Sequence, residues 1–287
     1  GDPDHPYVEV SQIIQAADVA VGTFNATMSD RVERTGCLVT TYQLVGSPQN
    51  ADAAARAGFD VMSVATNHIK DCGLNKSWCN DVFFDTLANL QRVGILTVGA
   101  GKNLAEALQP VVVTANGVRF GFVSLGDSKQ DMSLFAAEDW PGVAFLNEEN
   151  MRAALAQVKQ IADVIIVMPH WGSEDIILPN GIQRNQAKMI VSQGVDLVVG
   201  NHTHVIQAFH EIDGTPVFYG LGNFIFDQGL RDHRQGVILL VRFQGTKYLG
   251  YELIPTYHER NGRVHIADEK EAAEIMQRLQ EANAQLP

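Results

Sequence analysis

The order of apolar segments along this chain constrains its fold more than any other feature. Short runs rich in β-branched residues alternate with segments of helical spacing: the runs are 18–24, 60–64, 95–98, 164–168 and 195–199, and the helical segments are 50–57, 82–93 and 184–193. Strands that alternate with helices in this way are typical of α/β units, in which helices connect parallel strands. We therefore expect the first part of the chain to follow a β-α-β-α-β order.

The pattern changes after Gly200, where expected strands follow one another with only short turns between them. A helix rich in Glu, Ala and Gln is expected at the C-terminus, over 268–287. An α/β part that continues without a linker into a β-rich part predicts two packed sheets with helices outside, forming one domain over residues 1–287. The expected strands of the second part are 205–212, 217–219, 236–243 and 249–255.

Composition excludes several classes of protein. The 287 residues are 46% hydrophobic and 19% charged, as in soluble globular proteins. The formal net charge of -12 argues against nucleic acid and anionic membrane surfaces as partners. The apolar runs are far shorter than the ~20 residues that span a bilayer, and the chain starts without a basic and apolar leader. We expect a processed or trimmed N-terminus and no signal or anchor within this chain.

The three cysteines, Cys37, Cys72 and Cys79, are too few for a disulfide scaffold and wrongly spaced for a zinc ribbon. Cys72 and Cys79 flank a polar segment that one bridge could close. A bridge between these two, a bridge from Cys37 to either of them, and three reduced thiols all remain open.

Polar clusters follow four of the expected strands. Ligands of open α/β sheets bind at the ends of strands, so these clusters are candidates for a binding site. They lie at 66–68, 170–174, 200–204 and 222–223, and they contain four of the nine histidines: His68, His170, His202 and His204.

These histidines predict a metal site. His202 and His204 are two residues apart, so in an extended segment they face the same side and can share one cation or flank two. The alternative is a pair of turn histidines bonded to backbone. Together with His170, and with Asn67 as an oxygen ligand, they favour a transition metal. His68 faces away from Asn67 and is a candidate acid or electrostatic group acting on substrate, or else a loop cap.

Two carboxylates lie near this candidate site in the sequence. Glu174 follows His170 closely, and Asp227 follows the cluster that contains Asn223. Either carboxylate could position water or substrate, with a solvated surface role as the alternative. We place Glu174 with His68 as a candidate catalytic residue, and Asn223 and Asp227 as residues that line the site.

These motifs, in this order, resemble the CapA family of poly-γ-glutamate capsule synthesis, a branch of the calcineurin-like metallophosphoesterase superfamily. The resemblance runs from about residue 18 to 226 and implies a four-layer α-β-β-α sandwich of a single domain. It is carried by the segments 60–68 with Asp71 and Gly73, 99–103, 170–174, 200–204 and 219–224.

The resemblance also implies roles for individual residues. Asn67, His170, His202 and His204 would bind divalent Mn, Zn or Fe, and His68 would be the catalytic group. The implied chemistry is metal-assisted hydrolysis at a phosphoryl or acyl centre.

Two departures concern the acidic metal ligands of the superfamily. We expect this chain to begin after the strand whose Gly-Asp motif supplies one carboxylate in the superfamily. Where the family carries Asn-Leu-Glu, the chain reads Thr23-Phe24-Asn25, so Asn25 stands in the place of the expected Glu and is a candidate site-lining residue. A donor set of imidazoles and amides is neutral, so it suits one ion and would hold a second poorly.

The sequence therefore predicts an exported metalloprotein that acts on or handles an anionic γ-glutamyl or related cell-envelope polymer. Its expected location is extracellular, periplasmic or at the outer face of the membrane, with a membrane synthase or export complex as a candidate partner. Two alternatives remain open: an active metal-dependent hydrolase of phosphoesters or peptides, and a catalytically weakened polymer-binding accessory protein.

Overall fold

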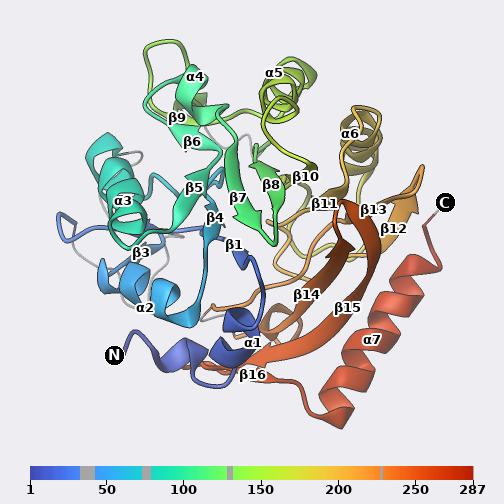
Figure 1. Ribbon diagram of the computed structural model, residues 1–287. Coiled ribbons are helices and arrows are strands. Elements are labelled where there is room, and N and C mark those ends of the chain that lie inside the picture. Colours follow the sequence, from blue (N-terminus) through green and yellow to red (C-terminus); the bar gives the residue numbers. More distant parts are fainter. Residues whose placement is uncertain (33–42, 73–78, 128–131, 227–228, 287) are drawn as a thin grey trace. The chain divides into compact units, whose positions relative to one another are not determined.

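The computed structural model describes residues 1–32, 43–72, 79–127, 132–226 and 229–286 (Figure 1). The chain forms two compact units, which are described separately. Unit 1 consists of Gly1–Asp4, Ser11–Val111 and Phe122–Val158, and unit 2 consists of His5–Val10, Val112–Gly121 and Lys159–Pro287. The single-domain organisation expected from the sequence stays a prediction.

Unit 1 is built on a three-stranded parallel sheet with the order β1-β4-β5. The strands are β1 (Val21–Thr23), β4 (Val61–Ser63) and β5 (Leu96–Val98), and helices α2 (Gln49–Ala57) and α3 (Asn80–Arg92) precede and follow β4. The expected β-α-β-α-β order is confirmed. The other elements are α1 (Ser11–Gln15), β2 (Thr27–Met28), β3 (Val45–Gly46), β6 (Ala100–Gly101), α4 (Leu104–Ala107), η2 (Met132–Leu134), β9 (Gly142–Val143) and α5 (Glu148–Val158).

The core of unit 1 forms where the apolar faces of α2 and α3 meet the sheet. Ala54 of α2, Met62 of β4, and Phe83 and Leu90 of α3 belong to one buried cluster. Burial of a side chain the size of Phe or Leu contributes roughly 1.5–3 kcal/mol. This packing fixes the C-terminal end of β4, after which the first candidate site residues follow.

Unit 2 carries most of a six-stranded sheet with the order β12-β13-β11-β10-β8-β7. Its strands β10 (Val164–Val167), β11 (Leu197–Val199) and β13 (Thr215–Phe218) are parallel neighbours, and β12 (Phe209–Ile212) is antiparallel to β13. The sequence analysis extended β12 back to residue 205, but residues 205–208 precede the strand and continue the loop after β11.

A β-hairpin forms the other end of this sheet. It joins β7 (Val111–Ala115) to β8 (Val118–Val123) through Asn116 and Gly117, whose φ angles of 50° and 79° are those that a two-residue hairpin turn requires. Helix α6 (Gly181–Val191) begins three residues before the predicted start, because Asn180 and Gln183 form a capping box.

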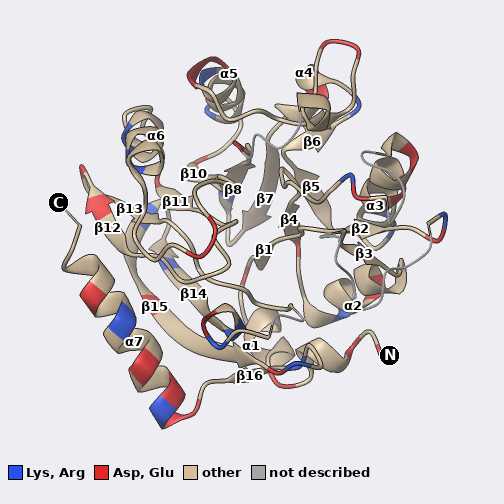
Figure 2. Cartoon of the chain, turned by 180° about the vertical axis from the view of Figure 1, so that it is seen from behind, with Lys and Arg blue, Asp and Glu red and all other residues tan. Residues whose placement is uncertain are grey.

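The remaining elements of unit 2 are η1 (His5–Tyr7), η3 (Asp232–Arg234) and an antiparallel sheet of β14 (Gln235–Gln244), β15 (Lys247–His258) and β16 (Val264–Ile266). Helix α7 (Glu269–Asn283) runs alongside β15 (Figure 1). Its apolar residues Ile275 and Leu279 pack with Val237. Its exposed side carries both acidic and basic residues (Figure 2).

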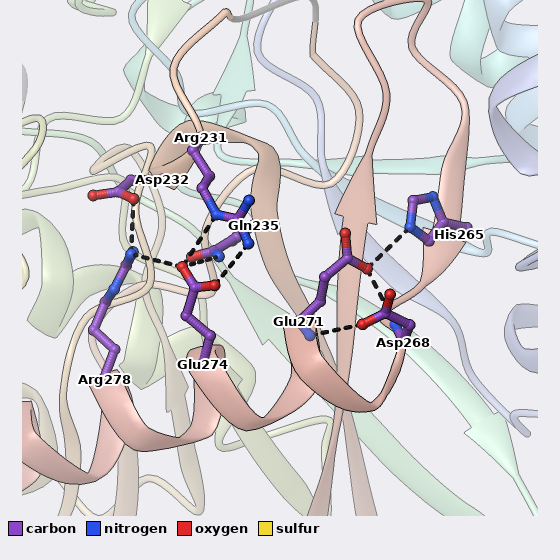
Figure 3. A network of polar contacts seen from close by, with 8 residues as sticks. All are labelled: Arg231, Asp232, Gln235, His265, Asp268, Glu271, Glu274 and Arg278. Atoms are coloured by element: carbon purple, nitrogen blue, oxygen red, sulfur yellow. Dashed lines mark hydrogen bonds and ion pairs between the residues drawn. The ribbon is translucent and has the colours of Figure 1, made fainter.

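Polar contacts also fasten α7 to η3. Arg231, just before η3, pairs with Glu274, and Arg278 pairs with Asp232, each at 2.7 Å (Figure 3). Within the described part of the chain, no helix has the length and apolar character needed to cross a membrane.

A disulfide joins Cys72 to Cys79, with their Cα atoms 5.6 Å apart. This is the first of the three alternatives that the sequence left open. Cys37 lies outside the described residues. Because Cys72 follows a candidate site segment directly, the bond closes the chain beside that segment.

Candidate functional site

The turn after β4 holds a histidine and a carboxylate in direct contact. His68 Nδ1 lies 2.7 Å from Asp71 Oδ2, and the backbone N–H of Leu44 donates to the same oxygen at 2.6 Å. Only 12% of the His68 side chain and 5% of the Asp71 side chain are exposed. We call this pair the His68–Asp71 dyad. It leaves Nε2 as the ring nitrogen that does not face the carboxylate.

Asn25 and Asn67 lie next to this dyad in unit 1. The side-chain oxygen of Asn25 accepts a hydrogen bond from the His68 backbone N–H at 3.1 Å. Asn67, the predicted oxygen ligand, is 1% exposed. Asn25 thus contacts the segment that carries both Asn67 and His68.

A buried lysine anchors the same turn. Lys70 is fully buried, and its Nζ donates to the carbonyl oxygens of Ser133 at 3.1 Å and Pro141 at 2.5 Å. The ammonium group also lies 5.4 Å from the ring centre of Phe83 and 5.3 Å from that of Trp140. The carbonyl dipoles and the faces of the two aromatic rings thus stabilise the buried ammonium group of Lys70. The sequence analysis assigned no role to Lys70 or Asp71, although the His-x-x-Asp spacing on a turn could have indicated the dyad.

A second group of candidate residues gathers in unit 2. His170 follows β10, and His202 and His204 follow the neighbouring parallel strand β11. His170 and Asn201 form a parallel bridge that continues the pairing of these strands. The ring centres of His170 and His202 are 4.5 Å apart, and those of His202 and His204 are 6.4 Å apart. We call these three residues the histidine group.

Amide side chains orient two rings of the histidine group. The Nδ1 atom of His170 contacts the side-chain oxygen of Asn201, and that of His204 lies 3.0 Å from the side-chain oxygen of Asn223. Asn223 in turn donates from Nδ2 to the carbonyl of His233 at 2.9 Å. Such contacts fix the direction of a ring that binds a ligand through its other nitrogen.

The loop that carries His202 and His204 is not the extended segment that the sequence analysis assumed. Both residues have positive φ angles, 99° and 59°, which are uncommon for residues other than glycine and cluster at functional sites. Just before them, a Cβ on Gly200 would lie 2.1 Å from Trp171 Nε1. The close approach of the Trp171 ring therefore requires glycine at the start of the loop.

The predicted carboxylates have different positions. Glu174 is half exposed, and its Oε1 lies 3.8 Å from His202 Nε2. The adjacent Asp175, which the sequence analysis did not select, pairs with His233 at 2.7 Å. The His233 ring stacks beside that of His204, with centres 6.1 Å apart. His233 was missed because it follows no expected strand end. Asp227 lies outside the described residues.

The donor chemistry of the histidine group fits a transition metal, because imidazole is a preferred ligand and two of its rings are held by outer contacts. Among the described residues, however, no group of three or more His, Cys, Asp or Glu is arranged to hold a metal ion. The fourth predicted ligand, Asn67, belongs to unit 1. The residues present thus supply suitable donors without forming a closed three-ligand centre.

The family model described as bacterial capsule synthesis protein PGA_cap matches residues 1–228. The chain belongs to this family. It is 29% identical over 231 residues to capsule biosynthesis protein CapA of Bacillus anthracis, covering 79% of this chain and 54% of that protein. It is 28% identical over 256 residues to PGA biosynthesis protein CapA of Bacillus subtilis, covering 88% of this chain and 64% of that protein. The chain thus spans between about half and two thirds of these relatives.

Solved structures confirm the expected fold class. A structure titled "Putative 5'-Nucleotidase from Staphylococcus aureus" superposes with a TM-score of 0.55 at 17% identity, covering 97% of this chain and 52% of that chain. A novel phosphatase of Mycoplasma pneumoniae superposes with a TM-score of 0.54 at 11% identity, covering 92% and 91%. This chain therefore has a mixed α/β fold of the metallophosphoesterase type.

Proposed function

We propose that this protein is a CapA-like metalloprotein that acts on or handles poly-γ-glutamate or a related anionic polymer during capsule or cell-envelope synthesis or export. Membership of the capsule synthesis family and the likeness to two CapA proteins support the polymer. The observation that supports a bound metal is the histidine group, which lies at the ends of two neighbouring parallel strands.

His170, His202 and His204 would supply imidazole donors to a divalent Mn, Zn or Fe ion. When bound, the ion would supply Lewis-acid activation of water at a phosphoryl or acyl centre. Asn201 and Asn223 keep two of the imidazoles in fixed orientations. Glu174 is half exposed and lies 3.8 Å from His202, and it would contact water or substrate rather than serve as a buried ligand.

The His68–Asp71 dyad would act on the substrate. Asp71 fixes the imidazole through Nδ1, so a proton can be accepted or donated at Nε2. The carboxylate is itself held by the Leu44 backbone N–H, which prevents it from turning away. This arrangement supports the hydrolase alternative.

One observation favours the second candidate, a weakened polymer-binding accessory protein. The side-chain oxygen of Asn25 accepts a hydrogen bond from the His68 backbone N–H, and the amide carries no charge. Neutral donors hold two dications poorly, because no carboxylate offsets their repulsion. Under this alternative the protein binds the polymer and a membrane synthase or export complex, without turnover.

The Cys72–Cys79 disulfide supports a location outside the reducing cytoplasm, at the outer face of the membrane, in the periplasm or outside the cell. The matched family is described as one of bacterial capsule synthesis, which agrees with such a location.

Metal content and hydrolysis test the proposal together. The chain is loaded with Mn²⁺ or Zn²⁺, its metal is counted by mass spectrometry, and turnover of a generic phosphodiester and a γ-glutamyl peptide is measured. Bound metal with turnover supports the hydrolase, and bound metal without turnover supports the accessory protein. Absence of bound metal contradicts the metalloprotein.

Asn25→Glu sharpens this test. A carboxylate at this position can still accept from the His68 N–H and adds a negative charge next to the segment that carries Asn67, the expected oxygen ligand, so we expect higher metal occupancy and higher turnover than in the parent. Asn25→Gln is the matched control, since it adds the same length without charge. An equal response of both variants would show that side-chain length, and not charge, limits the site.

A further inference from the structure

A hollow of about 490 Å³ opens in unit 2, on the antiparallel sheet that follows the residues matched by the family model. It lies where the start of β14 meets the end of β15 and the turn to β16. Its lining is polar and basic, and it consists of Arg234, Tyr257, Glu259, Arg260, Asn261 and His265.

The two arginines of this hollow differ from most others in the chain. In the described part of the molecule, nine arginines form ion pairs with carboxylates: Arg31, Arg56, Arg92, Arg119, Arg152, Arg231, Arg242, Arg263 and Arg278. Among the described arginines, only Arg184, Arg234 and Arg260 form no such pair, and Arg184 donates instead to the Pro179 carbonyl. In a protein of net charge -12, two guanidinium groups without carboxylate partners therefore share one hollow.

Arg234 is held in place by contacts that leave its charge uncompensated. Its Nε donates to the His258 carbonyl at 2.8 Å, and its guanidinium carbon lies 4.5 Å from the ring centre of Tyr257. A guanidinium group fixed at Nε and stacked on an aromatic face loses little side-chain entropy when its terminal nitrogens bind an anion. Planar carboxylates are the partners that such a fork binds in bidentate fashion.

The other charged groups of the hollow are already engaged. Glu259 accepts a hydrogen bond from Asn261 Nδ2 at 3.1 Å, and His265 Nε2 lies 3.3 Å from Glu271 Oε2 of α7 (Figure 3). The lining of the hollow has two guanidinium groups and one carboxylate, that of Glu259. With His265 counted as neutral, the formal net charge of the lining is therefore one positive charge. That balance favours a single carboxylate group of a ligand over a dense polyanion.

The hollow is also tied to the loop of the histidine group. Arg234 follows His233, whose carbonyl accepts from Asn223 Nδ2, and Asn223 holds His204. His258, whose carbonyl receives Arg234, contacts the same His233 carbonyl through Nε2 at 2.9 Å. A ligand group bound by Arg234 would thus lie next to His233, which hydrogen bonds through Asn223 link to His204 of the histidine group.

We propose that Arg234 and Arg260 form a carboxylate-binding subsite, which takes a side carboxylate of a γ-linked glutamate polymer. The assignment of the polymer rests on the proposed function. The subsite itself needs neither the metal nor the His68–Asp71 dyad, so its binding can be measured apart from both.

The test measures binding of a fluorescently labelled γ-linked glutamate oligomer to the full chain in EDTA, by anisotropy. Arg260→Gln and Arg234→Gln should each weaken binding about tenfold, and Arg234→Lys should not restore it, because an ammonium group lacks the planar fork. Arg260 is exposed, so its replacement leaves folding unaffected. Arg242→Gln, which removes a positive charge from the ion pair with Glu252 on the same sheet, is the matched control and should change binding less than twofold.

If Arg242→Gln weakens oligomer binding as much as Arg260→Gln does, the binding comes from general charge attraction and the proposed subsite is wrong. Binding of an oligomer whose carboxylates are amidated, tighter binding of polyphosphate, or no binding by the parent chain would also overturn the subsite. Metal content and turnover are measured without the oligomer, so the proposed function can fail or survive independently of the subsite.

Discussion

Histidines lie at strand ends in both units, but their surroundings differ. In unit 1, His68 contacts the carboxylate of Asp71, and a disulfide and a buried lysine fasten the same turn. In unit 2, the histidine group is oriented by the amides of Asn201 and Asn223 on a loop with positive φ angles. The histidine of unit 1 thus faces a carboxylate in a cross-linked turn, whereas two rings of the histidine group face amide side chains.

This difference separates two kinds of chemistry. A carboxylate that fixes one nitrogen of an imidazole suits proton transfer at the other nitrogen. Amide partners set the direction of a ring without bringing a charge to it, as suits a metal ligand. We therefore expect substitutions in the His68–Asp71 dyad to change turnover, and substitutions in the histidine group to change metal occupancy.

The largest effect is expected from the His68–Asp71 dyad. His68→Ala should lower turnover of any hydrolysed substrate by roughly 10²–10⁴-fold, the usual contribution of a general acid or base. Asp71→Asn should lower it less, because an amide oxygen can still accept from Leu44 N–H. Steady-state kinetics and metal analysis of the same samples check this. A loss of metal from His68→Ala that matches its loss of turnover would break the distinction between the two regions.

The next effect concerns the histidine group. His202→Ala or His204→Ala should abolish metal binding, and Asn223→Ala should weaken it by roughly 10–100-fold, as is typical of groups that orient ligands. Isothermal titration with Mn²⁺ or Zn²⁺ measures both. His210→Ala on β12 is the control, since His210 is also a histidine of unit 2 but no contact among the described residues joins it to the histidine group. Unchanged affinity in both histidine variants would make the pair structural.

Much of this comparison could be predicted from the sequence. Apolar runs and helical spacing located β4, β10 and β11, so the polar residues after them were recognised as candidates. His170 and His202 lie together because their strands are parallel neighbours, which the α/β order already indicated. Local chemistry also sufficed for the Asn116-Gly117 turn.

Other features depend on contacts that no local pattern encodes. His233 lies near His204 only because the segment before β14 returns to this sheet edge, and its partner Asp175 depends on a loop conformation. The extended shape assumed for residues 202–204 was wrong because close packing of Trp171 on Gly200 and the turn that follows override the alternation. Lys70 was missed because its partners are backbone carbonyls more than sixty residues away.

The disulfide should produce a stability effect in unit 1. Replacing Cys72 and Cys79 by Ser should lower the free energy of unfolding by roughly 2–3 kcal/mol, the loop-closure estimate for a short loop. Chemical denaturation measures this change, and Cys37→Ser is the control. Thiol titration of the unfolded, unreduced protein should find one free cysteine. Three free thiols in protein from an oxidising compartment would show that no disulfide fastens the turn of His68 in unit 1.

The smallest effect is a pH dependence at the start of β10, the strand that leads to His170. The Arg119 side chain and backbone N–H both donate to Asp163 and lower the pKa of its carboxyl from 3.8 to about 2. The folded protein therefore binds this proton less readily than the unfolded chain. The stabilisation is present above pH 3.8 and is lost as the pH falls toward about 2.

The difference in urea midpoint between the parent and Asp163→Asn should then be constant above about pH 5 and shrink below pH 3.8. Asp52→Asn is the matched variant in unit 1, where a side-chain hydrogen bond from Arg92 lowers the pKa of Asp52. Asp163 also accepts a backbone N–H, so its variant should show the larger change. A difference for Asp163→Asn that does not vary with pH would mean that the Arg119 contact forms equally in the unfolded chain.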